Sequence, residues 1–148
     1  MPVTSASEAN SNHMPRTLRS YIASHRWVHF VPSGVMLLAI TYMSIVKAPM
    51  PAPLQDVAFA DKWGHMLAYA VWAICMLCDC SRAGMSRTRV YVLSSSLTIA
   101  YGGLMEIVQY CFCPLRQGDW LDWLADIVGV CVAMLLYRVV SALLHVKR

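Results

Sequence analysis

Residues 30–46, FVPSGVMLLAITYMSIV, decide the fold class, because this run contains no charged side chain. Together with His29 it approaches the roughly 20 apolar residues that a helix needs to cross the hydrocarbon core of a bilayer. Pro32 lies near the start of the run, where a proline removes no internal hydrogen bond of a helix. The sequence therefore predicts a membrane-spanning helix over residues 29–46.

Three further apolar runs follow and are separated by helix-breaking segments. The predicted helices cover residues 62–80, 90–112 and 121–144. Three segments separate the four helices: a proline-rich one at residues 47–60, a basic one at 82–89, and PLRQGD at 114–119. Asp61 precedes the second helix and is predicted to be its N-cap. We therefore expect an all-α membrane protein with a four-helix transmembrane domain at 28–148, preceded by a polar tail at 1–27.

The composition supports a membrane class. Of the 148 residues, 58% are hydrophobic and 14% are charged, whereas soluble domains carry about 25% charged residues. The net charge of +4 does not indicate nucleic-acid binding, because the basic residues lie in the tails and between apolar runs rather than on one stripe. The first apolar run continues too long for a secretory signal and should remain as an anchor.

The distribution of lysine and arginine predicts the orientation. The tail, the 82–89 turn and the C-terminus each carry three basic residues, which exceeds the number in either other connection. Short cytoplasmic loops retain such an excess. We therefore expect both termini on the cytoplasmic side of a bacterial inner membrane.

This orientation brings the ionisable residues together on the extracytoplasmic side. They flank the start of the second helix, the end of the third and the start of the fourth. The candidate binding residues are Asp61, Lys62, His65, Tyr69, Glu106, Gln109, Arg116, Asp122 and Asp126, with Asp119 beside them.

Helical spacing places several of these residues on shared faces. Asp122 and Asp126 share a face that continues through Gly129 and Ala133, which predicts close approach of another helix. Glu106 lies several ångströms below the interface, where an ionised acid facing lipid is costly. We therefore expect Glu106 to point inward toward a cation, namely Lys62, His65 or Arg116, and Asp126 to do the same.

Metal and cofactor signals are weak. Cys75, Cys78 and Cys80 have a spacing that resembles metal ligands, and Cys111 and Cys113 offer two more thiols. The predicted topology places these two groups at opposite membrane faces, which excludes a joint zinc site. We expect no metal site and no cofactor.

Two segments carry a resemblance to a known family: DKWGHMLAYAVWA at 61–73 and YGGLMEIVQYCFCPLRQGDWLDWLADIVG at 101–129. Their pattern resembles that of the VanZ-like (teicoplanin-resistance) family. The matching positions are Asp61, Lys62, His65, Tyr69, Glu106, Gln109, Arg116, Asp122, Asp126 and Gly129. Asp126 departs from this pattern, which usually has Asn there. The resemblance implies a polytopic cell-envelope protein, in some members associated with teicoplanin resistance, and leaves the reaction open.

Three functions are compatible with these residues. The leading hypothesis is binding of an amphiphilic ligand: a lipid, a lipid-linked envelope intermediate or a lipoglycopeptide. In it, Lys62 and Arg116 bind anionic groups that Glu106 and Asp122 orient. The second is an intramembrane enzyme with His65 as general acid or base and Glu106 or Asp122 as its orienting carboxylate. The third is a structural or accessory subunit in which residues such as Asp61 and Asp119 only cap or join helices.

Overall fold

The computed structural model describes residues 26–46, 59–113 and 118–146, and every regular element in these ranges is helical. A short 3-10 helix, η2 (Arg26–Phe30), leads into α3 (Val31–Ile45) and is followed by α4 (Ala60–Arg82), α5 (Arg87–Phe112) and α6 (Trp120–Val146). Four spans in these ranges are long and apolar enough to cross a membrane, the first of them including most of η2. This confirms the predicted all-helical architecture with four such spans. The predicted tail lies almost entirely outside the described residues.

The start of α4 differs from the prediction. Phe59 is the N-cap, with a left-handed backbone (φ 59°, ψ 28°), and the helix begins at Ala60. The prediction that Asp61 caps this helix is therefore wrong. Asp61 lies inside the first turn, where its carboxylate is close to the positive end of the helix dipole.

The connection between α4 and α5 is shorter than expected because α4 ends in a compact Schellman motif. Gly84 adopts a left-handed φ of 76°, and its N–H donates to the carbonyl of Ser81 at 3.0 Å while that of Met85 donates to Cys80 at 3.2 Å. The helix α5 then begins at Arg87, three residues before its predicted start at residue 90. The basic residues of the predicted turn consequently belong mostly to helix ends.

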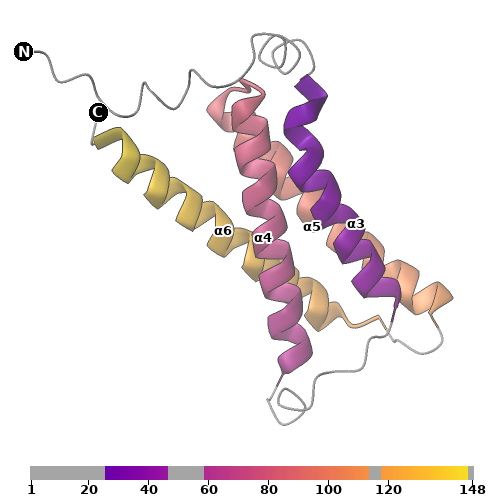
Figure 1. Cartoon of the computed structure of the whole chain (residues 1–148). Helices are drawn as coiled ribbons and strands as arrows, with labels where there is room; N and C mark the ends of the chain where they lie inside the picture. The colour runs from indigo at the N-terminus through magenta and orange to yellow at the C-terminus, as the bar shows by residue number, and fades with distance from the viewer. Residues whose placement is uncertain (1–25, 47–58, 114–117, 147–148) are drawn as a thin grey trace, which may run out of the picture.

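Successive helices run in opposite directions, so the bundle has two distinct ends (Figure 1). At one end α4 and α6 begin and α3 and α5 finish; we call it the His65 end. At the other, the Asp79 end, α4 finishes and α5 begins. The helix α4 packs against each of the other three long helices. Its buried face repeats every four residues at Tyr69, Ala73 and Leu77.

The closest helix pair is α4 and α6, and glycine makes it possible. A Cβ atom at Gly129 would collide with the backbone carbonyl of Met66. Val130 and Ala133 continue this contact and are fully buried. The predicted close approach through Gly129 and Ala133 is therefore confirmed.

The outer faces of the bundle are apolar. Large side chains such as Leu38, Leu104 and Leu135 are more than half exposed on their helices. Such surfaces are typical of helices that face lipid. In lipid, helices associate through close packing at small residues, because removing apolar surface from water contributes little there.

Candidate functional site

Lys62 joins the first turn of α4 to the start of α6. Its Nζ donates to Asp119 Oδ2 and to Asp122 Oδ1, both at 2.7 Å. Asp119 also caps α6, since its Oδ1 accepts the N–H of Leu121 at 2.9 Å. The ammonium of Lys62 holds the pKa of the Asp119 carboxyl below its usual value. Because Asp122 is buried, Lys62 compensates a charge that would otherwise have little contact with water.

His65 lies one turn deeper and is bonded to a second acid of α6. Its Nδ1 is 3.2 Å from Asp126 Oδ1, and the ring is parallel to that of Tyr69, with centroids 6.5 Å apart. Asp126 is fully buried, and its other oxygen, Oδ2, has no hydrogen-bond partner among the described residues. This carboxylate therefore retains acceptor capacity at a depth where such capacity is costly.

The third helix of the site, α5, contributes Glu106. This side chain is buried, and its Oε2 accepts the backbone N–H of Asp119 at 2.8 Å. One turn earlier on the same face is Gly102, where a Cβ atom would stand 2.7 Å from Asp126 Oδ2. The absent side chain at Gly102 thus leaves room for the Asp126 carboxylate against α5. One donor atom each from His65, Glu106 and Asp126 lie within 4.8 Å of one another.

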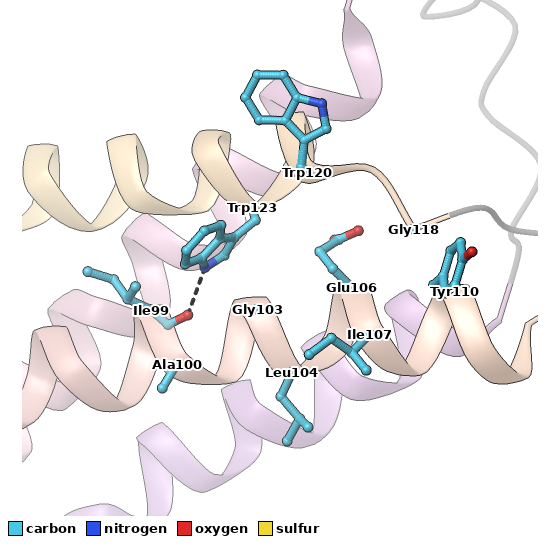
Figure 2. Close-up of a pocket in the computed structure, with 10 residues that line it drawn as sticks. All are labelled: Ile99, Ala100, Gly103, Leu104, Glu106, Ile107, Tyr110, Gly118, Trp120 and Trp123. Carbon is cyan, nitrogen blue, oxygen red and sulfur yellow. Dashed lines mark hydrogen bonds between the residues drawn. The ribbon is translucent and has the colours of Figure 1, made fainter.

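An open apolar groove of about 620 Å³ runs between α5 and the start of α6. Figure 2 shows the Trp123 indole lying across α5 near Gly103, with its Nε1 donating to the carbonyl of Ile99 at 3.0 Å. The Glu106 carboxylate points toward the start of α6 in the same view. Glu106 lines the groove and also belongs to the polar cluster, so the two are continuous. The groove is lined by Ile99, Ala100, Gly103, Leu104, Glu106, Ile107, Tyr110, Gly118, Trp120 and Trp123.

Most of the candidate residues named from the sequence meet at the His65 end. The structure gathers Asp61, Lys62, His65, Glu106, Asp119, Asp122 and Asp126 there. Tyr69 lies beneath His65, whereas Gln109 turns toward α3 and donates through Nε2 to the carbonyl of Ser44 at 2.9 Å. Arg116 lies outside the described residues. Of the three partners expected for Asp126, namely Lys62, His65 and Arg116, the structure shows His65. For Glu106, Lys62 is not the partner, because it pairs with Asp119 and Asp122.

Several features of the site were not apparent from the sequence. The enzyme hypothesis named Glu106 or Asp122 as the acid that orients His65, whereas the acid bonded to His65 is Asp126. The groove was not predicted either, because its apolar residues resemble ordinary lipid-facing positions. A useful signal was present at Gly102, since a glycine four residues before an intramembrane acid leaves space for a group from another helix. The cysteines, whose spacing resembled that of metal ligands, are all free thiols.

The described part of the site is rich in acids. Asp61, Glu106, Asp119, Asp122 and Asp126 face one lysine and one histidine. Such a cluster has groups that can bind a cation, position an imidazole for proton transfer, or join helices. Comparison with models of known protein families, with curated proteins and with solved structures finds no match for this chain.

Proposed function

We propose that this chain is a VanZ-like protein of the bacterial cytoplasmic membrane that binds an amphiphilic ligand on the extracytoplasmic side. The ligand class is a membrane lipid, a lipid-linked envelope intermediate or a lipoglycopeptide. An amphiphile needs an apolar surface for its chain and polar groups for its head. The carrying observation is that Glu106 belongs to both the groove and the polar cluster.

The size and composition of the groove suit this role. Its volume of about 620 Å³ is within the range of roughly 300 to 1,000 Å³ that is usual for small-molecule sites. Leu104, Ile107 and Tyr110 offer an apolar wall along α5. An acyl or prenyl chain would occupy this wall while its polar head reaches Glu106 and the groups beyond it.

The basic residues at the two ends of the bundle support the proposed orientation. Arg82, Arg87 and Arg89 lie at the Asp79 end, whereas Lys62 at the His65 end is paired with acids. Positive charge is retained on the cytoplasmic side, so the His65 end faces outward. In a cysteine-free background, an impermeant maleimide added to intact cells should label Gln117→Cys and not Ser86→Cys. The opposite pattern would reverse the orientation.

Photocrosslinking tests the ligand groove directly. The full chain is placed in phosphatidylcholine nanodiscs that contain a small fraction of phosphatidylglycerol with a diazirine on its acyl chain. Mass spectrometry should find crosslinks enriched along residues 99–110 relative to the exposed α3 face at Leu38. Ala100→Trp fills the groove and should reduce this labelling severalfold.

The matched control is Val92→Trp, which adds the same side chain at an exposed position of α5 outside the groove lining. Labelling in this variant should equal that of the wild type. Uniform labelling of all exposed helix faces, or no effect of Ala100→Trp, would refute the groove as a ligand site.

The His65–Asp126 contact of 3.2 Å supports a second candidate, an intramembrane enzyme acting on a lipid-linked substrate. His65 would transfer the proton, and Asp126 would hold the imidazole in position. His65→Ala and Glu106→Gln separate the alternatives. Loss of product with retained lipid crosslinking favours the enzyme, whereas loss of folded yield alone favours a structural subunit.

A further inference from the structure

We infer that His65, Glu106 and Asp126 form a binding site for one divalent transition-metal ion. Their donor atoms come from three helices and lie within 4.8 Å of one another. The site is enclosed, because the side chain of Asp126 is 1% exposed and that of His65 is 10% exposed. This inference goes beyond amphiphile binding and does not depend on it.

The unpartnered oxygen of Asp126 is the independent observation that points to a ligand. Oδ2 has no hydrogen-bond partner among the described residues. It lies against Gly102, on the face of α5 that carries Glu106 one turn later. A buried carboxylate oxygen normally has a donor or a cation beside it. Here the chain leaves that oxygen on the side from which Glu106 approaches.

The separations fit metal coordination. Two adjacent ligands at about 2.1 Å from one ion are about 3.0 to 3.4 Å apart, and His65 Nδ1 is 3.2 Å from Asp126 Oδ1. An ion can therefore replace the hydrogen between these two atoms, which releases that proton, and the unpartnered Oδ2 of the same carboxylate can serve as a further ligand atom. One oxygen of Glu106 lies within 4.8 Å of the other two donor atoms, so Glu106 has to approach them further to enter the same coordination sphere.

The surrounding groups position these ligands. The N–H of Asp119 holds Oε2 of Glu106 at 2.8 Å, and the parallel ring of Tyr69 supports His65. Groups that orient metal ligands in this way strengthen metal binding. Glu106 also lines the open groove, so the remaining coordination positions are accessible to water or to the polar head of a ligand.

The donor set indicates the class of metal. One imidazole nitrogen with two carboxylate oxygens suits Mn²⁺ or Zn²⁺, whereas Ca²⁺ and Mg²⁺ prefer oxygen ligands alone. A second donor set, Asp61, His65 and Asp122, is less suitable, because Lys62 already binds Asp122 at 2.7 Å. The His65, Glu106 and Asp126 set is therefore the site that we assign.

Manganese is the appropriate probe, since the six free thiols would bind softer Zn²⁺ elsewhere. The full chain is purified in detergent, treated with chelator and titrated with MnCl₂, and free Mn²⁺ is followed by electron paramagnetic resonance. We expect one bound Mn²⁺ per chain and a loss of affinity of at least about tenfold in His65→Gln, Glu106→Gln and Asp126→Asn. Gly102→Ala, which displaces Asp126 Oδ2, should weaken binding to a smaller extent.

Two controls match these variants. Asp79→Asn removes a buried carboxylate at the opposite end, and Gly103→Ala adds a methyl group next to Gly102 whose nearest neighbours are atoms of Trp123. Both should bind Mn²⁺ as the wild type does. Electron spin echo modulation on the wild type should show coupling to one histidine nitrogen, and this readout does not require any variant to fold. No Mn²⁺ binding, no nitrogen coupling, or equal binding by Asp126→Asn would overturn the inference.

Discussion

Asp79 and Asp126 are both completely buried, at opposite ends of the same bundle, but their surroundings differ. At the Asp79 end, Oδ2 accepts the N–H and the hydroxyl of Ser33 at 3.1 and 2.6 Å, and Oδ1 accepts from Arg82 at 3.2 Å. At the His65 end, Asp126 has one bonded oxygen and one without a partner among the described residues. Two equally buried acids therefore differ in how many of their oxygens accept a hydrogen bond.

Under the proposed metal site, this difference distinguishes a structural acid from a metal ligand. Asp79 joins α4 to the first turn of α3, and both of its oxygens are occupied by groups of this chain. Asp126 joins α6 to α4 through His65, and its second oxygen has no hydrogen-bond partner among the described residues. Burial alone would have ranked the two equally, so the count of bonded oxygens decides between them.

The same substitution at both acids is expected to give the largest contrast. In chelator, Asp79→Asn should lower the free energy of unfolding by about 3 kcal/mol, because an amide cannot accept from Ser33 and Arg82 together. Asp126→Asn should change it by less than about 1 kcal/mol, because it removes a charge that was only partly compensated. Denaturant titration of both variants in detergent measures this. Equal losses would show that both acids are structural.

Removing the cation at each end sharpens the comparison. Lys62→Met should cost about 2 kcal/mol, since the side chain of Lys62 is 24% exposed and its loss leaves buried Asp122 without a cation. Arg82→Met should cost less than about 1 kcal/mol, because Arg82 is 60% exposed and Ser33 still binds Asp79. The same unfolding assay measures both values, and a larger loss for Arg82→Met would contradict this view of the two ends.

The smallest expected effect is a pH dependence at the His65 end. Lys62 holds the pKa of Asp119 below its usual 3.8, so the ionised carboxylate is favoured in the folded chain. Its contribution to stability is present above pH 3.8 and is lost as the pH falls through the lower folded pKa.

Asp119→Asn isolates this charge, because asparagine also caps helices well. The stability difference between wild type and variant should be present at about pH 6 and should shrink below about pH 4. High salt should reduce it, since the Asp119 side chain is 37% exposed. A difference that stays constant down to pH 2 would exclude the Lys62 contact as its source.

Much of the fold could be predicted because each long apolar run identifies a membrane-spanning helix by itself, without knowledge of the other helices. The four spans and the approach of α6 at Gly129 follow from composition and spacing. Asp61 was misplaced as a cap because Phe59 adopts a left-handed conformation that few non-glycine residues show and that no local pattern indicates.

Pairing within the site was harder to predict. Helical periodicity places His65 and Asp126 on defined faces, but which acid meets which base depends on how far each helix extends and rotates in three dimensions. Lys62, for example, reaches Asp119 and Asp122 rather than Glu106. The contact of Asp79 with Ser33 could not be predicted either, since the two residues are 46 positions apart in the sequence.

The backbone contact between Gly129 and Met66 has a mechanical consequence. A Cβ atom at Gly129 would collide with the Met66 carbonyl, so the close contact resists sliding of α4 past α6. Near the groove, the helix α5 is joined to α6 by the hydrogen bonds of Trp123 and Glu106. Hydrogen bonds of this kind break and re-form more easily than two closely packed backbones separate. Under the proposed ligand binding, a displacement of α5 that widens the groove is therefore the motion expected to admit or release the ligand.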